Sequence, residues 1–313
     1  AIYHSLLTMN KNHYVAIMAG GIGSRFWPVS KKSFPKQFID IMGTGESLIK
    51  QTYNRFSHMV PQENIFVVTN TDYVPLVQSH IPEMDISRIL HEPLAKNTAP
   101  CIALANRHIQ NLNPDAVCLV APSDHLILEE SNFQNITLQA LDFVSNIKAL
   151  VTLGIKPTHP NTGYGYIQYE GHEVTKGIFK VKTFTEKPNV ELAEAFLESG
   201  DYVWNAGIFI FSIPTFKREL NKHLSRMAEQ FEEGLVHYYS PTEEDFIRKV
   251  YAVCKSISVD NGIMEKAQEV KVILADIGWS DLGTWKSLYE IKDKDEKGNV
   301  IEGQVMVFDT EKC

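Results

Sequence analysis

Residues 14–40 read YVAIMAGGIGSRFWPVSKKSFPKQFID. The run Tyr14–Ala19 is continuously apolar, which is typical of a strand buried on both faces of a parallel sheet. The glycine-rich turn after it lets the backbone approach a ligand closely, so that several amide groups can point at phosphate oxygens. Cations follow the turn, and strand, flexible turn and positive charge together predict a polyphosphate site. The glycines are Gly20, Gly21 and Gly23, and the cations are Arg25, Lys31, Lys32 and Lys36.

This turn does not fit the two commonest nucleotide-binding patterns. A dinucleotide-binding GxGxxG motif that starts at Gly21 would need glycine at Phe26, and a P-loop would need Gly-Lys-Ser or Gly-Lys-Thr after four intervening residues. A glycine-rich turn by itself is also found as a plain connection between a strand and a helix. The neighbouring Arg25 and Lys36 favour phosphate binding over that alternative.

The composition indicates a globular protein with a large core. The chain has 313 residues, of which 44% are hydrophobic, and this fits one large α/β domain with an appendage, or two domains. Its net charge of −8 argues against a general nucleic-acid binder, which would carry a basic face. No apolar run approaches the roughly 20 residues of a membrane span, and the first residues lack a signal-peptide pattern. We therefore expect a cytoplasmic protein that binds neither nucleic acid nor membrane.

The cysteines form no CxxC pair and show no zinc spacing, so we expect reduced, structural thiols. Met9 is a candidate natural start, in which case residues 1–8 are an added segment. The cysteines are Cys101, Cys118, Cys254 and Cys313.

Strand and helix patterns alternate through the first half of the chain. The alternation predicts an α/β fold with a Rossmann-like, doubly wound sheet, in which ligands bind outside the carboxyl ends of the strands. The turns after Ala19 and Ala121 would then be neighbours. The predicted strands are Ile65–Thr69, Ala116–Ala121 and Leu150–Leu153, and the predicted helices are Glu46–Met59, Ala99–Asn111 and Phe133–Asn146.

From Gly163 onward, aromatic and β-branched residues predict strands that make the sheet mixed. Helical patterns cover Asn189–Ser199, the charged stretch from Pro214 to about Val253, and Asp281–Ile291 with an N-cap near Ser280. We expect one domain over residues 1–291, a charged linker over 292–299, and the start of a short β-rich tail, complete or truncated, over 300–313.

The opening stretch resembles the signature GGxGxR followed by P-K of the sugar-nucleotide pyrophosphorylases, and its form GGIGSRFWPVS…FPKQF is similar to their mannose-1-phosphate guanylyltransferase branch. Later motifs extend the resemblance to about residue 290. It implies a nucleotidyltransferase domain, transfer of GMP from GTP to mannose 1-phosphate, and a homodimer. Because this reaction joins two polyanions, it requires cations, backbone amides and a divalent metal such as Mg²⁺.

The resemblance assigns the nucleotide to two motifs. Arg25 offers a bidentate fork and Lys36 a point charge to phosphate oxygens, although surface cations are usually only solvated. The segment HEPLAKNTAPC, residues 91–101, is similar to EPxxxNTAP and would lie by guanine or ribose, with helix capping as the alternative. The implied nucleotide-binding residues are Ala19, Gly20, Gly21, Gly23, Ser24, Arg25, Glu92, Asn97, Thr98 and Ser123.

Two aspartates are the candidate ligands of Mg²⁺, which takes one or two carboxylates together with phosphate oxygens. Asp124, in APSDH, follows a buried strand, so its carboxylate would emerge at the ligand edge of the sheet. Asp281, in GWSDLGTW, is far away in sequence. A local turn or a helix cap is the alternative for each. The resemblance implies metal binding by both and catalytic roles for both, together with Arg25 and Lys36, whereas His125 is expected to be structural.

The sugar phosphate is assigned by similarity to the family's GYGYI, EKP and WNxGxF motifs. Glu186 and Asn205 suit hexose hydroxyls, Lys187 suits the sugar phosphate, and Gly163 offers a backbone amide. Tyr164 belongs to the same set. An ion pair on an edge strand or a turn asparagine is the alternative role for such residues.

A further segment, SVDNGIMEKA, resembles SxDYxxMEK, with Asn261 in the place of tyrosine. Asp260 and Glu265 are either functional or helix-face charges. Lys96 stands where arginine is common in the family and lacks the bidentate fork. Two alternatives to the implied function stay open, namely another base or hexose and a non-catalytic regulatory paralogue.

Overall fold

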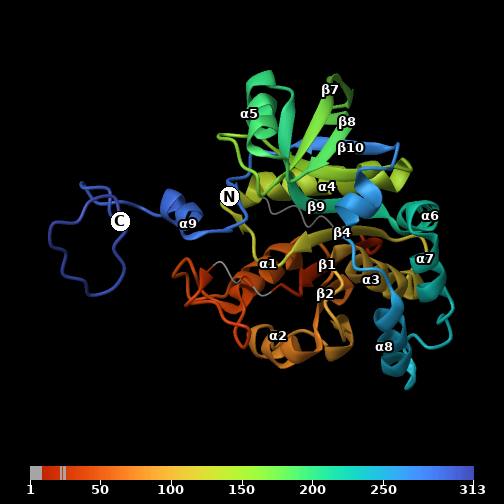
Figure 1. Ribbon diagram of the computed structural model, residues 1–313. Coiled ribbons are helices and arrows are strands. Elements are labelled where there is room, and N and C mark those ends of the chain that lie inside the picture. The colour runs from red at the N-terminus through yellow and green to blue at the C-terminus, as the bar shows by residue number, and fades with distance from the viewer. Residues whose placement is uncertain (1–8, 22, 24–25) are drawn as a thin grey trace, which may run out of the picture.

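Strand β1 (His13–Ala19) lies in the parallel part of a nine-stranded sheet in the computed structural model, which describes residues 9–21, 23 and 26–313 (Figure 1). It pairs in parallel with β2 (Ile65–Asn70) on one side and with β4 (Val117–Pro122) on the other. The strand β3 (Ile89–Glu92) extends the parallel part beyond β2. The loops after these strands therefore gather at one edge, as the sequence predicts.

The rest of the sheet is mixed. β9 (Tyr202–Ser212) lies antiparallel between β4 and β6 (Leu150–Ile155), and β10 (Val270–Leu274) pairs in parallel with β6. β8 (Ile178–Glu186) and β7 (Gly165–Thr175) complete the order β3-β2-β1-β4-β9-β6-β10-β8-β7, and β7 also pairs with β9. The predicted α/β fold with a doubly wound mixed sheet is confirmed.

Alternate residues of β1 belong to two separate cores, because successive side chains of a strand point to opposite faces of the sheet. Val15 and Ile17 pack in one cluster, and Tyr14 and Ala16 pack in the other. The first cluster contains side chains of α1 (Leu48–Ser57), α2 (Val74–His80) and α4 (Glu130–Asn146). The second contains side chains of α3 (Thr98–Leu112), α6 (Ile213–His223), α7 (Ser225–Glu232) and α8 (Glu243–Val253).

Two predicted helices differ in extent from the structure. The predicted helix Asp281–Ile291 begins later, as α9 (Trp285–Ile291), and Thr284 rather than Ser280 caps it by accepting from the amide of Ser287. The reason is that Asp281 Oδ1 accepts from the amide of Gly283 at 2.9 Å. This contact forms a tight turn between the preceding strand and the helix. The stretch from Pro214 to Val253 contains three helices, α6, α7 and α8. The helix α5 (Val190–Ser199) has Asn189 as its N-cap, close to the predicted start.

Residues 292–313 extend away from the body of the molecule beyond α9 (Figure 1). The chain turns within the charged segment 292–299, where Asp295 Oδ1 accepts from the amides of Lys297 and Asn299. Residues 300–313 form bends and no strand, because the alternating segment has no second strand beside it. Its apolar side chains are therefore open to solvent, and Met306 and Phe308 are 85% and 78% exposed.

All four cysteines are free, as predicted, and three of them are buried. Among the described residues, no helix is both long enough and apolar enough to cross a membrane.

Candidate active site

A short ribbon brings the two candidate metal ligands to the same edge of the sheet. β5 (Leu126–Ile127) pairs antiparallel with β11 (Trp279–Ser280), with Ser280 opposite Leu126. Asp124 lies between β4 and β5, and Asp281 follows β11 directly. The ribbon thus joins segments about 150 residues apart at the carboxyl end of β4.

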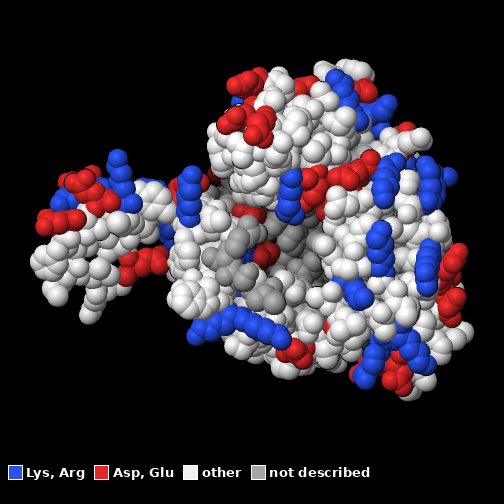
Figure 2. Space-filling view, in the orientation of Figure 1, with Lys and Arg blue, Asp and Glu red and all other residues white. Residues whose placement is uncertain are grey.

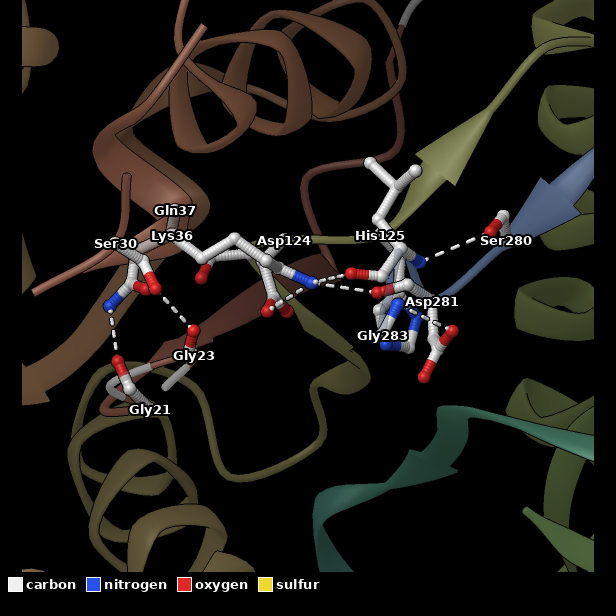
Figure 3. Close-up of polar contacts among 12 residues, drawn as sticks. Gly21, Gly23, Ser30, Lys36, Gln37, Asp124, His125, Ser280, Asp281 and Gly283 are labelled. Atoms are coloured by element: carbon white, nitrogen blue, oxygen red, sulfur yellow. Dashed lines mark hydrogen bonds and ion pairs between the residues drawn. The ribbon is translucent and has the colours of Figure 1, made fainter. Parts of the chain in front are cut away.

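The Lys36 ammonium connects these two segments (Figure 3). Its Nζ lies 2.8 Å from Asp124 Oδ2 and donates to the backbone oxygens of Asp281 at 2.7 Å and of Leu282 at 3.2 Å. Lys36 is only 4% exposed, with its Cβ beside Gly23 and its Nζ 5.8 Å from the centroid of the Phe26 ring. A buried cation therefore links the Asp124 carboxylate to the backbone of Asp281.

The charges around Asp124 set its protonation state. Burial by itself would raise the pKa of Asp124, but the charge of Lys36 and its hydrogen bond to the carboxylate act in the opposite direction, and the pKa is lowered. Burial lowers the pKa of His125, against the opposing effect of the Asp124 carboxylate. The indole Nε1 of Trp279 donates to His125 Nδ1 at 3.2 Å, so this ring nitrogen acts as an acceptor. Asp124 is thus held as an anion beside a neutral imidazole.

The oxygens of this site fit a hard divalent cation. Asp124 Oδ2 already contacts one cation, the Lys36 ammonium. The Asp281 carboxylate is oriented by the Tyr164 hydroxyl, which donates to its Oδ1 at 2.7 Å, and by the Gly283 amide. The described part of the chain holds no group of three or more His, Cys, Asp or Glu side chains that could bind a metal by themselves. A metal here would need substrate oxygens beside the two carboxylates, which is the coordination that Mg²⁺ prefers.

The glycine loop after β1 is tied to the segment that carries Lys36 (Figure 3). Gln37 Nε2 donates to the backbone oxygens of Ala19 at 3.0 Å and of Gly21 at 2.9 Å. Gly23 has a φ of +64°, and a Cβ there would lie 2.5 Å from Lys36 Cβ. This position therefore requires glycine both for its backbone and for its close approach.

Two of the predicted phosphate-binding residues, Ser24 and Arg25, lie outside the described residues. Ser123 is described and is buried at the end of β4, where its amide donates to the backbone oxygen of Met18 at 3.0 Å.

A cavity of about 320 Å³ adjoins the glycine loop. Its lining includes both Asp124 and Glu92, so it connects the candidate metal site with the predicted base-binding segment. Figure 2 shows this face of the molecule hollowed between the part that carries β7 and β8 and the part that carries β1 and β2, with acidic and basic side chains around the hollow. The remaining lining residues are Met18, Gly20, Gly21, Asn70, Ala95, Lys96, Asn97, Thr98, Cys101 and Pro122.

Asn97 and Thr98 begin α3 at the wall of this cavity. Asn97 has a φ of +71°, and its side-chain oxygen accepts from the Thr98 amide at 2.8 Å. Thr98 Oγ1 accepts from the amide of Val259 at 2.8 Å. Both side chains therefore stabilise the start of α3, and Thr98 also fixes the segment that leads to Asp260.

Aromatic rings surround Asp281 on its other side. The ring of Tyr164 lies edge-on to those of Trp204 and Trp279, with centroid separations of 5.0 and 5.2 Å. These rings line a second cavity of about 460 Å³, together with Gly163 and Asp281. The amide of Gly163 donates to Asn161 Oδ1 at 2.8 Å and is thus already paired. Asp281 therefore lies where the aromatic cavity and the Lys36 site adjoin.

The other predicted sugar-binding residues form a second polar cluster. Asn205 Nδ2 donates to Asp260 Oδ1 at 2.9 Å, and its Oδ1 accepts from the Thr152 hydroxyl at the same distance. Lys187 pairs with Glu186 at 2.7 Å. Asp260 begins a π-helical turn, Asp260–Met264, and burial together with the charge of Glu186 raises the pKa of Asp260 to about 7. Both the nitrogen and the oxygen of the Asn205 side-chain amide are thus already hydrogen-bonded within the protein.

The contacts of two residues of the site could not be anticipated from the sequence motifs. Gln37 lies next to the predicted Lys36, but nothing in the pattern shows that it braces the loop. Tyr251 lies in α8, and its hydroxyl donates to Glu92 Oε1 at 2.9 Å. An aromatic residue at helical spacing predicts only a core position, so a contact between residues so far apart in sequence becomes visible only in three dimensions.

Known proteins resemble this chain over most of its length. The sequence profile of the nucleotidyl transferase family matches residues 14–298. The mannose-1-phosphate guanylyltransferase RfbM of Salmonella typhimurium is 39% identical over 296 residues, which cover 92% of this chain and 60% of the relative. A mannose-1-phosphate guanylyltransferase of Salmonella montevideo is 37% identical over 309 residues, which cover 95% of this chain and 64% of the relative. The chain thus spans somewhat less than two thirds of the length of these relatives.

A solved structure has the same fold. It is described as a mannose-1-phosphate geranyltransferase of Thermus thermophilus, it is 31% identical, and its TM-score is 0.81 over 91% of this chain and 81% of that chain.

Proposed function

The chain belongs to the nucleotidyl transferase family, and we propose that it transfers GMP from GTP to mannose 1-phosphate. Both Salmonella relatives are named as mannose-1-phosphate guanylyltransferases, and the alignment with them covers more than nine tenths of this chain. Residues 1–291 would form the catalytic domain, residues 292–299 the linker and residues 300–313 the start of the tail. The cytoplasmic location and the homodimer expected from the sequence stay predictions.

The reaction is a direct substitution at the α-phosphorus of GTP. An oxygen of the sugar phosphate forms a bond to this phosphorus, and the bond from the α-phosphorus to the oxygen that bridges to the β-phosphate breaks. Pyrophosphate leaves with the electron pair of that bond, and no proton has to be removed from a nucleophile that is already anionic near neutral pH. Positioning and charge stabilisation are therefore what the protein must supply.

The residues of the site would supply them as follows. The amides of the glycine loop and the ammonium of Lys36 would bind phosphate oxygens, and Arg25 is expected to do the same. Asp124 and Asp281 would hold Mg²⁺, which when bound supplies positive charge to the reacting phosphates. The aromatic cavity beside Asp281 and the cluster of Glu186, Lys187 and Asn205 would receive the sugar phosphate.

The observation that carries this proposal is the continuity of the 320 Å³ cavity, which reaches both Glu92 and Asp124. A nucleotide with its base near Glu92 would thus bring its phosphates to the Lys36 site. The nearest alternative is the same chemistry with another base or hexose. The second is a non-catalytic paralogue, against which the presence of Asp124, Asp281 and the glycine loop argues.

The test is a coupled pyrophosphate assay with GTP, ATP, UTP and CTP in all combinations with the 1-phosphates of mannose, glucose and galactose. Pyrophosphate release from GTP should require both mannose 1-phosphate and a divalent metal, and Asp124→Asn and Asp281→Asn should lower kcat by about 100-fold or more. Release with another pair of substrates would support the nearest alternative. No release by folded protein with any pair would exclude catalysis and leave the paralogue.

A further inference from the structure

Tyr251 and Glu92 form a buried pair at the wall of the nucleotide cavity. The Tyr251 hydroxyl donates to Glu92 Oε1 at 2.9 Å, and the two side chains belong to α8 and to the end of β3. Tyr251 is fully buried and Glu92 is 6% exposed. Glu92 lines the cavity and Tyr251 does not, so the tyrosine reaches the cavity only through the carboxylate.

The second oxygen of Glu92 lies beside the glycine loop. A Cβ built on Gly20 would lie 3.3 Å from Glu92 Oε2, and both residues line the cavity. The hydroxyl of Tyr251 fixes Oε1 on one side, and the lack of a side chain at Gly20 leaves space on the other. The carboxylate is thus held with its Oε2 toward the loop that is expected to bind the phosphates of the same nucleotide.

We propose that Tyr251 is a positioning residue that sets the base selectivity of the site, by holding the Glu92 carboxylate as an acceptor for the N1–H and 2-amino groups of guanine. The inference rests on the proposed use of a guanine nucleotide. Adenine has an acceptor at N1 and no 2-amino group, so a carboxylate in this place repels its edge instead of binding it. Hypoxanthine, the base of ITP, keeps the N1–H and lacks only the 2-amino group. A comparison of ITP with GTP therefore separates the contact to the 2-amino group from the contact to N1–H.

The protonation of Glu92 agrees with this role. Burial raises its pKa to about 7, and the hydrogen bonds from Tyr251 and Cys101 act in the opposite direction because they favour the ionised form. A carboxylate accepts with both oxygens, whereas a protonated carboxyl has become a donor at one of them. The hydroxyl of Tyr251 therefore favours the form of Glu92 that can accept from guanine.

The experiment compares the wild-type chain with Tyr251→Phe, which keeps the ring and removes only the hydroxyl. Affinities for GTP, ITP and ATP are measured by calorimetry, with inorganic pyrophosphate as a probe of the phosphate site. Tyr238→Phe is the matched control, because Tyr238 is also buried but its hydroxyl donates to the backbone oxygen of Phe231 at 3.0 Å rather than to Glu92. A double variant with Glu92→Gln shows whether the two residues act as one unit.

For Tyr251→Phe we expect the ratio of GTP to ATP affinity to fall about tenfold, since a hydrogen bond to a charged group is lost. Pyrophosphate binding should not change. Tyr238→Phe should keep the wild-type ratio, and Tyr251→Phe should have no further effect in the Glu92→Gln background. A merely structural tyrosine would weaken all ligands alike, and an unchanged ratio in Tyr251→Phe would overturn the inference.

Failure of the proposed function would be seen in the wild type instead. A wild-type chain that binds no nucleotide, or that prefers ATP, contradicts the guanylyltransferase proposal and the inference with it. A wild-type chain that prefers GTP, combined with a Tyr251→Phe variant that keeps this preference, leaves the proposed function intact and overturns only the role of Tyr251.

Discussion

Lys36 Nζ and Asp124 Oδ2 lie 2.8 Å apart, and the same ammonium donates to the backbone oxygen of Asp281. The two residues belong to the segment after the glycine loop and to the end of β4, and β11 brings Asp281 to the same place. A buried ammonium therefore holds the three parts of the candidate site together before any substrate enters. In the proposed reaction, the oxygens of a bound triphosphate would offer this ammonium further partners of the same charge as Asp124.

The first prediction concerns Lys36 itself. Replacement by methionine keeps the length of the side chain and removes the charge, so kcat for pyrophosphate release should fall by about 100-fold or more. Lys31→Met is the matched control, because Lys31 is an exposed cation of the same segment, and it should keep kcat within about threefold. If Lys36→Met kept the same kcat as Lys31→Met in the coupled assay, the charge of Lys36 would have no part in catalysis.

The second prediction concerns the tyrosine behind Asp281. Tyr164→Phe removes the hydroxyl that donates to Asp281 Oδ1, and the loss of such a partner typically weakens metal binding about tenfold or more. Asp281→Asn should weaken it further. Binding of Mn²⁺ in the presence of GTP, followed by electron paramagnetic resonance, measures this directly and does not depend on turnover. Wild-type Mn²⁺ affinity in both variants would remove Asp281 from the metal site.

The third prediction concerns the glycine loop. Gly23→Ala should destabilise the protein by about 1–3 kcal/mol, because it places a Cβ at a positive φ, 2.5 Å from Lys36 Cβ. The variant should also lose activity, since the clash displaces Lys36. Gly21→Ala is the control for stability alone, because no described atom lies within 4 Å of a Cβ built there. Chemical denaturation and the pyrophosphate assay measure both effects, and equal stability of the two variants would contradict this account.

The fourth prediction concerns pH. The pKa of Asp260 is raised from 3.8 to about 7 in the folded protein, so between these values the folded state binds a proton that the unfolded chain has released. The contribution of Asp260 to the free energy of unfolding therefore falls as the pH rises through this window and is constant above it. Asp260→Asn does not titrate. Hence the stability of the wild type relative to the variant should fall from pH 4 to pH 7.

Urea denaturation of both proteins across this range measures the difference. A difference that is independent of pH would show that Asp260 titrates normally. Glu92, whose pKa is also raised to about 7, contributes in the same direction to both proteins and cancels in the comparison.

The sequence predicted those parts of the fold that depend on local pattern. Continuous apolar runs correctly located the strands around Tyr14–Ala19, and the βα alternation placed Asp124 at the ligand edge of the sheet. The late start of α9 was missed because the helical pattern near Asp281 gives no sign that its carboxylate accepts from Gly283. The alternating pattern of residues 300–313 is typical of a strand, but it cannot show whether a partner strand lies beside it, and these residues form bends.

The side chains that support the site could not be predicted in this way. The hydrogen bonds from Tyr251 to Glu92 and from Asn205 to Asp260 join residues that are far apart in the chain. Residue spacing reports which face of a helix or strand a side chain occupies, and it contains no information on which distant segment packs there. Motif resemblance marked Glu92, Asn205 and Asp260, but it carries no signal for Tyr251 and does not show which of these residues pair.

The central position of β9 limits how the two halves of the sheet can move relative to each other. This strand pairs with β4 in the half of the sheet that carries the glycine loop, and with β6 and β7 in the half that carries the sugar motifs. The two halves therefore share one continuous ladder of hydrogen bonds and cannot swing apart like two domains on a hinge. A relative motion of these two halves would have to twist this shared sheet, because no flexible linker separates them.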